Sequence, residues 1–331
     1  MNKDRIGTIL KRQNLVSGDS ITFKPLEGGV SSDICLVSDG QNKYVIKQAL
    51  SQLQVDDEWY ADRSRNEIEQ EFMQYLDKHR PGAVPRLIYN DREEQFFVME
   101  YLDQGFQNWK QQMLGGHFNE KTARQAAELL ADIHTSSHGD EALKRKFDNI
   151  ENFYSLRIEP YLVTTGVRHP ALEACFVEEA ERLRKHRTAL IHGDFSPKNI
   201  MTKEDRVVIL DHEVAWYGDP AFDLAFFLNH LHLKLLHHYF NTRAFRDLTG
   251  TARNAYFNQL GAVEPGLEER TGRLLLMMML ARVDGKSPVE YLSTEEQKFV
   301  RQFVYDQLPE QGNALPEITA TWKSKLKETF V

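Results

Sequence analysis

The feature that most constrains this 331-residue chain is a polar loop that separates two short apolar segments. The loop follows Leu190 and Ile191, and within it Asp194 and Asn199 stand five positions apart. The second apolar segment then runs into Asp211. Phosphoryl transfer needs this set of groups: a carboxylate that orients a hydroxyl and accepts its proton, and an amide and a carboxylate that hold Mg²⁺ against the nucleotide. The spacing therefore predicts a kinase active site in which Asp194 is the base.

The two apolar segments, residues 199–201 and 206–210, are placed to pair as a hairpin that turns through residues 203–205. Such a hairpin would return Asp211 to the neighbourhood of Asn199. Mg²⁺ prefers hard oxygen ligands and keeps several waters, so one amide and one carboxylate suffice beside the phosphates. A single Asp in a turn is more often only a turn former, but the three polar side chains together are far more specific. We therefore expect Asn199 and Asp211 to be the metal ligands.

These motifs resemble those of a known family. The run His192-Gly193-Asp194 with Asn199, followed by Asp211 and then by residues 218–225, is similar to the aminoglycoside phosphotransferase and choline kinase superfamily. Methylthioribose kinases, homoserine kinases and macrolide phosphotransferases belong to the same group. The similarity extends from about Gly28 into the C-terminal helical region. The resemblance implies a protein-kinase-like fold that uses ATP to phosphorylate a hydroxyl group on a small molecule.

The distribution of apolar residues indicates an α+β protein with two lobes. The first hundred residues are rich in short strand-like runs, and helical periodicity dominates the remainder. Helices that follow strands in this way favour an α+β fold over a doubly wound sheet. We expect a small nucleotide-binding lobe over residues 1–102 and a larger, mostly helical catalytic and substrate-binding lobe over residues 103–331. The helices expected from periodicity are residues 61–79, 120–136, 171–186, 220–237 and 294–308.

The resemblance implies an architectural role for two further polar residues. His192 and Asp223 would tie the catalytic loop to the following helix and would not touch substrate.

A glycine-containing turn in the first lobe is a candidate phosphate-binding loop. It lies between two strand-like runs, residues 20–25 and 33–37. Glycines let the backbone approach phosphate oxygens, and serine hydroxyls add donors. The turn lacks the Gly-Lys-Ser/Thr ending of a Walker A loop, and two glycines between strands are more often an ordinary hairpin turn. The residues expected to contact the nucleotide here are Gly28, Gly29, Ser31 and Ser32.

The next strand, residues 43–49, supports the interpretation of this turn as a phosphate-binding loop. It carries Lys47 after alternating apolar positions. In the kinase pattern a lysine at this place contacts the α- and β-phosphates. A carboxylate from the first long helix should hold it, and Glu67, Glu69 and Glu71 all compete for that role. The family pattern favours Glu69. The other two are four residues apart and share a different helix face, so only one of these faces can supply the partner.

The strand that ends near residue 99 runs into a polar segment. In the resembled fold this segment is the hinge between the lobes. Main-chain groups of Glu100 and Leu102 would there bond the edge of the adenine ring.

Four residues are candidates for contacts with the acceptor. Glu213 and Trp216 follow Asp211 closely, and the Trp216 ring could stack against a sugar. Arg282 and Asp284 interrupt an apolar helix late in the chain. A helix end with a basic residue explains them more simply, but late helices line the substrate side of the cleft in this superfamily.

The composition fits an ordinary globular protein, with 41% hydrophobic residues and a formal net charge of −8. That charge disfavours nucleic-acid binding. The first residues lack the apolar core of a signal peptide, and the most apolar run, Leu274–Ala281, is too short to span a membrane. Cys35 and Cys175 fall in different predicted lobes and are expected to be reduced, which favours a cytoplasmic enzyme.

Histidines crowd one of the expected helices, residues 220–237 and the position after it. No second cluster completes a zinc coordination set at standard spacing, so zinc is disfavoured there.

The expected function is ATP- and Mg²⁺-dependent phosphorylation of a small-molecule hydroxyl, on a sugar, an amino alcohol or a related metabolite. A protein kinase is disfavoured because the interval from Asp211 to Gly218 leaves no room for a long activation segment, and Gly193 replaces the arginine of His-Arg-Asp. A non-catalytic pseudokinase is disfavoured because Lys47, Asp194, Asn199 and Asp211 are all present. An aminoglycoside or macrolide antibiotic remains the alternative acceptor, and the lack of a markedly acidic insertion favours a metabolite.

Overall fold

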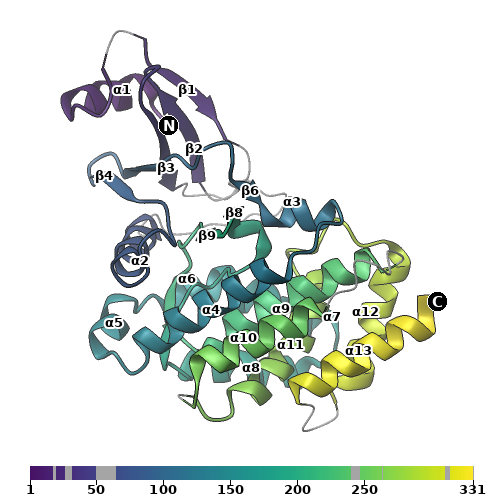
Figure 1. Cartoon of the computed structure of the whole chain (residues 1–331). Coiled ribbons are helices and arrows are strands. Elements are labelled where there is room, and N and C mark those ends of the chain that lie inside the picture. The colour runs from purple at the N-terminus through teal and green to yellow at the C-terminus, as the bar shows by residue number, and fades with distance from the viewer. Residues whose placement is uncertain are drawn as a thin grey trace. The chain divides into compact units, whose positions relative to one another are not determined.

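The computed structural model describes residues 1–17, 20–26, 32–49, 65–239, 247–262, 264–309 and 314–330. The chain forms two compact units (Figure 1). The N-terminal unit is Met1–Phe106 together with Leu210–Glu213, and the C-terminal unit is Gln107–Ile209 together with Val214–Val331. A five-stranded sheet dominates the first unit and helices dominate the second, so the predicted α+β fold class is confirmed. The lobe boundary at residue 102 stays a prediction.

The sheet of the N-terminal unit is antiparallel throughout, with the strand order β1-β2-β3-β5-β4. Its strands are β1 (Thr22–Pro25), β2 (Ser32–Ser38), β3 (Lys43–Ala49), β4 (Leu87–Asp91) and β5 (Phe96–Glu100). The central strand β3 coincides with the predicted one. It places Lys47 opposite Ile34 on one neighbouring strand and opposite Phe97 on the other.

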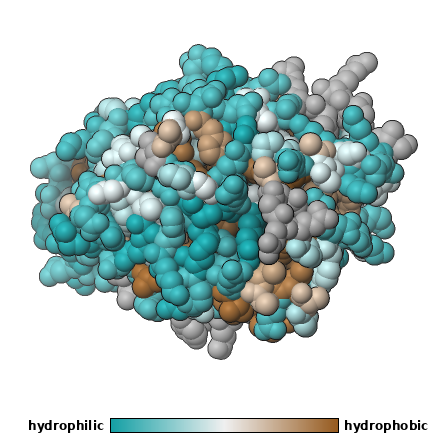
Figure 2. Space-filling view, turned by 90° about the horizontal axis from the view of Figure 1, so that it is seen from below, coloured by the Kyte–Doolittle hydropathy of each residue, from teal (hydrophilic) through white to brown (hydrophobic). Residues whose placement is uncertain are grey.

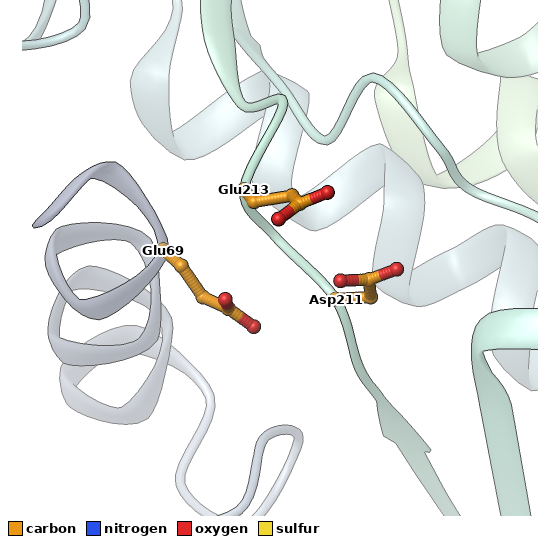
Figure 3. A group of neighbouring side chains, drawn as sticks. All are labelled: Glu69, Asp211 and Glu213. Atoms are coloured by element: carbon orange, nitrogen blue, oxygen red, sulfur yellow. The ribbon is translucent and has the colours of Figure 1, made fainter. Parts of the chain in front are cut away.

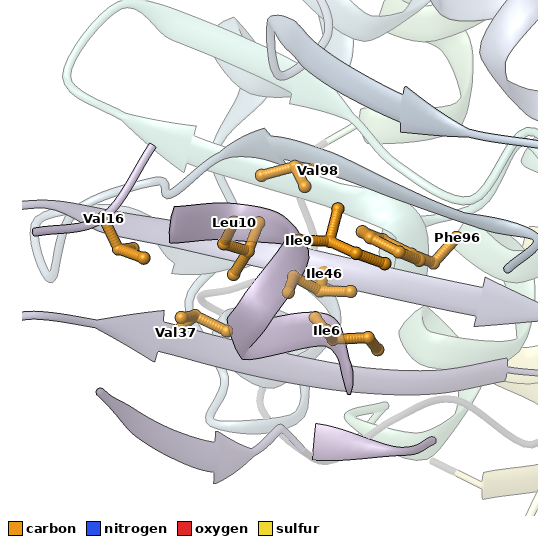
Figure 4. Close-up of a cluster of buried hydrophobic side chains, with 8 residues drawn as sticks. All are labelled: Ile6, Ile9, Leu10, Val16, Val37, Ile46, Phe96 and Val98. Atoms are coloured by element: carbon orange, nitrogen blue, oxygen red, sulfur yellow. The ribbon is translucent and has the colours of Figure 1, made fainter. Parts of the chain in front are cut away.

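Helix α1 (Lys3–Arg12), which the sequence analysis did not predict, covers this sheet. The Asn2 side chain caps the helix by accepting a hydrogen bond from the Arg5 N–H at 3.2 Å. Apolar residues of α1 pack on side chains from strands β2, β3 and β5 (Figure 4). The buried cluster consists of Ile6, Ile9, Leu10, Val16, Val37, Ile46, Phe96 and Val98.

Helix α2 (Arg65–His79) forms the described part of the helix predicted for residues 61–79. Its side chains Phe72, Met73 and Leu76 are buried, and so is Glu69. Because residues 69, 72, 73 and 76 recur at intervals of three and four, they share the inner face of the helix. The carboxylate of Glu69 is thereby directed into the unit.

The C-terminal unit is built from helices that pack in pairs. Helix α4 (Glu120–Ser137) packs on α10 (Leu248–Leu260), and α9 (Pro220–His237) packs on α11 (Leu267–Asp284) (Figure 1). The other α-helices among the described residues of this unit are α3 (Trp109–Leu114), α5 (Glu141–Lys146), α6 (Ile150–Phe153), α7 (Thr164–Arg168), α8 (Glu173–Lys185), α12 (Thr294–Gln307) and α13 (Leu315–Phe330). A π-helix, η1 (Tyr154–Val163), follows α6. The helices predicted from periodicity in this unit are confirmed, with ends that differ by at most two residues.

Short strands position the polar loops of this unit. Strands β8 (Ile200–Lys203) and β9 (Arg206–Ile209) form the predicted hairpin, with Ile200 opposite Ile209. Strand β7 (Ala189–Ile191) pairs with β10 (Trp216–Gly218). A short strand, β6 (Gln107–Asn108), extends the hairpin, and a single 3₁₀ turn, η2 (Pro197–Asn199), precedes it.

The face seen in Figure 2 is largely hydrophilic, with hydrophobic residues in small patches. Large exposed hydrophobic side chains in the described ranges are Val167, Val177 and Tyr305. No helix among the described residues is long and apolar enough to cross a membrane.

Candidate functional site

Lys47 is the centre of a buried ion-pair group in the N-terminal unit. Its ammonium donates to Glu69 Oε1 at 2.8 Å and to Asp211 Oδ1 at 2.5 Å. The Lys47 side chain is only 4% exposed. Of the three carboxylates that competed in the sequence analysis, Glu69 makes the contact. Strand β3, helix α2 and the segment after strand β9 therefore each contribute one charged group.

Glu213 belongs to the same group and not to a separate acceptor-facing surface. Carboxylate oxygens of Glu69, Asp211 and Glu213 lie within 4.8 Å of one another, a spacing that could hold a metal ion. Figure 3 shows Glu69 on helix α2 and the other two side chains on one loop. The buried Arg65 guanidinium pairs with Glu213 at 3.2 Å. The prediction that Glu213 contacts the acceptor is thus not supported, because its carboxylate is buried beside these charges.

The electrostatics of this group follow from its burial and its excess of carboxylates. Burial alone would lower the pKa of Lys47, but the surrounding carboxylates, with Asp211 first, raise it above its ordinary value. The ammonium therefore stays charged. Burial raises the pKa of Glu69 to about 7; Lys47 opposes this change, and the negative charges of Asp211 and Glu213 add to it. Three carboxylates face two cations here, so a further positive charge would be stabilised.

The backbone around Asp211 is unusual. Asp211 has a φ of +67°, in the left-handed region that costs non-glycine residues about 1 kcal/mol or more. The next residue, His212, stacks its ring on Phe72 of helix α2 with the centroids 4.7 Å apart. The packing of the His212 ring holds this strained segment in place. The residues on either side of His212, Asp211 and Glu213, both belong to the carboxylate group.

Asp194 lies in the C-terminal unit between a guanidinium and an amide. Its Oδ2 atom is 3.1 Å from Arg157 Nη2 and accepts a hydrogen bond from Asn199 Nδ2 at 2.9 Å. The other carboxylate oxygen, Oδ1, makes no hydrogen bond within the described residues. The Asp194 side chain is 16% exposed. One face of the carboxylate is therefore fixed, and the other is left for a ligand.

Asp223, at the start of helix α9, holds the loop that carries Asp194 through hydrogen bonds to its main chain. The Asp223 carboxylate accepts hydrogen bonds from the N–H of His192 at 2.6 Å and of Gly193 at 2.9 Å. The His192 ring in turn accepts from the Asp194 N–H at 3.1 Å. Gly193 has a φ of +76°, and a Cβ atom there would lie 2.6 Å from the Val214 carbonyl oxygen. These contacts give His192 and Asp223 the architectural position that the resemblance implied.

Asn199 is oriented by the same network. Its amide nitrogen donates to the main-chain and side-chain oxygens of Asp194, at 3.1 and 2.9 Å. This leaves the amide oxygen without a hydrogen bond in the described part of the chain. An amide oxygen is a hard ligand suited to Mg²⁺. The donor set of Asn199 fits the predicted metal role, whereas the expected proximity of Asn199 to Asp211 concerns both units and stays a prediction.

The structure describes only some of the other residues that were predicted to contact the nucleotide. Gly28, Gly29 and Ser31 lie outside the described residues, and the neighbouring Ser32 is buried at the start of strand β2. The Glu100 N–H donates to the Arg86 carbonyl at 2.9 Å, so only its carbonyl is left for an adenine contact. Leu102 follows strand β5 outside regular structure. Their roles stay predictions.

The structure does not support the predicted stacking of the Trp216 ring against a sugar. The residue forms part of strand β10 and is 1% exposed. Its indole stacks on Phe153 with the ring centroids 4.9 Å apart. Trp216 therefore packs the interior of the C-terminal unit and offers no surface to a sugar.

Arg282 and Asp284 on helix α11 face different surroundings. The Asp284 carboxylate binds Arg301 at 2.7 Å and His169 at 3.0 Å, an arrangement that links three helical segments. Arg282 instead donates to the Tyr161 hydroxyl at 3.2 Å, and its guanidinium lies over the Tyr161 ring. The predicted acceptor role thus suits Arg282, whereas the contacts of Asp284 are those of a structural ion pair.

Two functional candidates had no signal in the sequence motifs. Arg157 lies in the π-helix η1, far upstream of the Asp194 loop that it contacts. Arg65 opens helix α2 and reaches Glu213. A π-helix is often associated with functional sites, but its wider turn cannot be recognised from composition.

A family model described as the phosphotransferase enzyme family matches residues 22–272. The chain belongs to the phosphotransferase enzyme family. The predicted family resemblance is thereby confirmed. The matched range includes parts of both units.

Among curated proteins, the chain is similar to methylthioribose kinase 1 of Oryza sativa subsp. japonica, with 25% identity over 251 residues, 64% of this chain and 56% of that protein. It is also 26% identical over 212 residues to the methylthioribose kinase of Pectobacterium atrosepticum, covering 56% of this chain and 52% of that protein. The chain thus spans about half the length of the curated relatives it matches.

Among solved structures, a choline/ethanolamine kinase family protein from Mesorhizobium loti aligns with a TM-score of 0.51 and 16% identity. The alignment covers 99% of this chain and 94% of that one. At this identity the likeness shows the fold alone, which is the kinase-like fold expected from the motifs.

Proposed function

We propose that this member of the phosphotransferase family is an ATP- and Mg²⁺-dependent kinase that phosphorylates a hydroxyl group of a small molecule. The observation that carries the proposal is the Asp194 carboxylate, which Arg157 and Asn199 hold by Oδ2 while Oδ1 is left open. A carboxylate arranged in this way can accept the proton of an acceptor hydroxyl.

The N-terminal unit would bind the nucleotide. Lys47, kept charged and fixed by Glu69, is suited to the α- and β-phosphates. The turn with Gly28, Gly29, Ser31 and Ser32 would add main-chain and hydroxyl donors. Main-chain groups of Glu100 and Leu102 would contact the adenine ring.

The carboxylate group fits a divalent cation because its negative charge exceeds the positive charge around it. Asp211 and Asn199 are the proposed ligands, and Glu213 is a further candidate that the sequence analysis had assigned elsewhere. When bound, Mg²⁺ would neutralise the negative charge of the phosphates.

In the proposed reaction, Asp194 Oδ1 accepts the hydroxyl proton as the acceptor oxygen bonds to the γ-phosphorus and ADP departs. Arg157 keeps the carboxylate aligned. The loop contacts to Asp223 hold the base in place, so that catalysis depends chiefly on positioning.

The cytoplasm is the proposed compartment, supported by two cysteines that are both free thiols. A metabolite is the proposed acceptor, and the curated relatives named as methylthioribose kinases support a sugar-like hydroxyl compound. The non-catalytic alternative is not favoured by any contact around Lys47 or Asp194.

The decisive test is Asp194→Asn, with Asp205→Asn in the exposed hairpin turn as the matched control. The first variant should lower turnover by about 10²–10⁴-fold and leave ATP affinity nearly unchanged, whereas the control should behave as wild type. ADP formation across a panel of small hydroxyl compounds, together with calorimetric titration of ATP, measures both quantities. Equal turnover in Asp194→Asn and wild type would refute the assignment.

A further inference from the structure

Three basic side chains of the C-terminal unit, one of them fully buried, act on one another through their charges, apart from the ion pairs described above. Helix α9 contributes Lys234, helix α11 contributes Arg282, and helix α3 contributes Lys110. We call these three residues the basic cluster. Lys234 is 1% exposed, although lysine is among the residues least often buried. In a protein with a net charge of −8, this local excess of positive charge requires an explanation.

The buried ammonium of Lys234 lacks an acidic partner among the described residues. Its nearest hydrogen-bonding group is the Tyr291 hydroxyl at 3.5 Å, and it lies 5.1 Å from the centre of that ring. Glu290 is the carboxylate whose negative charge acts on Lys234. Its side chain is 64% exposed and pairs with Lys110 at 2.5 Å. An uncompensated buried ammonium costs several kcal/mol, so its retention indicates a ligand.

Two further buried nitrogen atoms at this place have no hydrogen-bond partner in the described structure. The Nδ1 atom of His230, one helical turn before Lys234, is buried without a hydrogen-bond partner. The same holds for Nε of Arg282. Arg282 uses Nη1 for the Tyr161 hydroxyl and for the carbonyl and hydroxyl oxygens of Ser287, while Nη2 makes no hydrogen bond among the described residues. The Nε–Nη2 edge is the side with which arginine binds a carboxylate through two parallel hydrogen bonds.

The charges of the cluster act on one another. Burial, and then the positive charges of Arg282 and Lys110, lower the pKa of Lys234 to about 7, while Glu290 opposes the change. The same basic residues and Lys198 help to lower the pKa of the buried His230, for which burial is the main cause. An anion placed among these groups would relieve the repulsion.

The basic cluster is one aromatic ring away from the proposed catalytic base. Two guanidinium groups lie over the Tyr161 ring, that of Arg282 at 5.8 Å and that of Arg157 at 5.9 Å from its centroid. Arg157 in turn contacts Asp194 at 3.1 Å. A small molecule whose hydroxyl reaches Asp194 could therefore extend another of its groups to Arg282.

We propose that the acceptor carries a carboxylate group in addition to its hydroxyl, and that Arg282 and Lys234 bind this carboxylate. The inference rests on the proposed function and narrows its acceptor to hydroxy acids. It disfavours acceptors whose only charge is an amine, because the basic cluster would repel them. Lys110 contributes long-range attraction, and its pairing with Glu290 leaves it less available for direct contact.

The experiment compares short hydroxy acids and hydroxy amino acids with their primary amides, in which the negative charge alone is removed. ADP formation and mass spectrometry of the product give kcat/KM for each compound, and calorimetry without nucleotide gives direct binding. The enzyme variants are Lys234→Met, which removes the charge at nearly constant size, and Arg282→Lys, which keeps the charge but loses the two-donor edge. Lys325→Met, exposed on helix α13, is the charge-matched control.

For wild type and the Lys325→Met control, we expect an acid to exceed its amide in kcat/KM by at least about tenfold. Lys234→Met should remove this preference through KM for the acid, with KM for ATP unchanged, and Arg282→Lys should weaken it. Removal of a buried, unpartnered charge should not impair folding, which thermal unfolding verifies.

Phosphorylation of neutral or amine-bearing compounds with an efficiency equal to that of the acids would overturn the carboxylate inference and leave the proposed kinase function intact. An acid preference that survives in Lys234→Met would do the same. Acid binding that depends on Lys234 without any ADP formation would support the binding site and reject the kinase function instead. Failure of every acid both to bind and to react would overturn the inference.

Discussion

Arg157 Nη2 lies 3.1 Å from Oδ2 of Asp194, although the two residues come from the π-helix η1 and from the loop after strand β7. The same guanidinium donates to the Gly193 carbonyl through Nε. Arg157 therefore fixes both the main chain and the carboxylate of the proposed base. We infer that it is a positioning residue for the reaction.

Replacing Arg157 should impair turnover more than binding. Arg157→Met is expected to lower kcat by about 10–10²-fold, because small misplacement of a catalytic group is costly, while ATP affinity stays near wild type. Arg157→Lys should recover only part of the loss, since it lacks the planar fork. Steady-state kinetics with Arg184→Met, which removes a more exposed arginine, provides the comparison. A parallel loss in that control would point to a general effect on stability.

Metal-dependent nucleotide binding should depend on the carboxylate group of Figure 3. Asp211→Asn is expected to abolish the Mg²⁺-dependent part of ATP binding, and Glu213→Gln should weaken it by at least about tenfold, as is typical when a metal ligand or its supporting residue is lost. Calorimetric titrations with and without Mg²⁺ separate the two contributions. If Glu213→Gln binds Mg²⁺-ATP with the affinity of wild type, Glu213 is not a metal ligand and its role is the ion pair with Arg65.

The choice of Glu69 as partner of Lys47 has a direct test on one helix. Glu69→Gln leaves the ammonium with fewer negative charges and should weaken ATP binding by about tenfold, because Lys47 loses its orientation. Glu67→Gln removes an exposed carboxylate two positions earlier and should leave binding unchanged. Equal affinities of the two variants for ATP would show that Asp211 alone holds Lys47.

Gly193 should tolerate no side chain. Its φ of +76° and the 2.6 Å approach of an added Cβ to the Val214 carbonyl combine backbone strain with a steric clash. Gly193→Ala is expected to cost more than the roughly 1–2 kcal/mol of left-handed backbone strain and to reduce turnover. Gly139 has a φ of +71° with open space around it, so Gly139→Ala isolates the strain. Denaturant unfolding and kinetics of both variants test the difference.

Lys234 should make stability depend on pH. Its folded-state pKa of about 7 lies below the value of about 10.4 expected for an unfolded chain. Between these values the unfolded state holds more protons, so the free energy of unfolding should rise with pH, by up to about 1.4 kcal/mol per unit from this group. Below about pH 7 the penalty is fully present and constant.

The variant Lys234→Met should therefore be more stable than wild type at neutral and acid pH. Its free energy of unfolding should also lack the rise with pH that Lys234 causes. Urea unfolding at several pH values between neutral and alkaline measures the effect, with Lys325→Met as control. Identical slopes in Lys234→Met and wild type would contradict the burial of a charged lysine.

Much of the fold follows from local patterns. Helices α9 and α12 were predictable because their apolar periodicity extends over many residues, and the β8–β9 hairpin was predictable from its polar turn. Helix α1 was missed because it is short and its apolar positions become informative only against the sheet that they cover. Trp216 was misplaced for a related reason: its burial depends on Phe153, a residue distant in sequence.

The sequence by itself determined the residue types of the candidate site and their order along the chain, since motif spacing is a local property and carries the chemistry of Asp194, Asn199 and Asp211. Only the tertiary structure selected Glu69 among its neighbours, moved Glu213 into the carboxylate group and brought Arg157 to Asp194. The tertiary structure also buries Lys234 without an acidic side chain in contact with it among the described residues. These outcomes depend on which helices pack together, and packing energy is shared among many distant residues, so that no short motif records it.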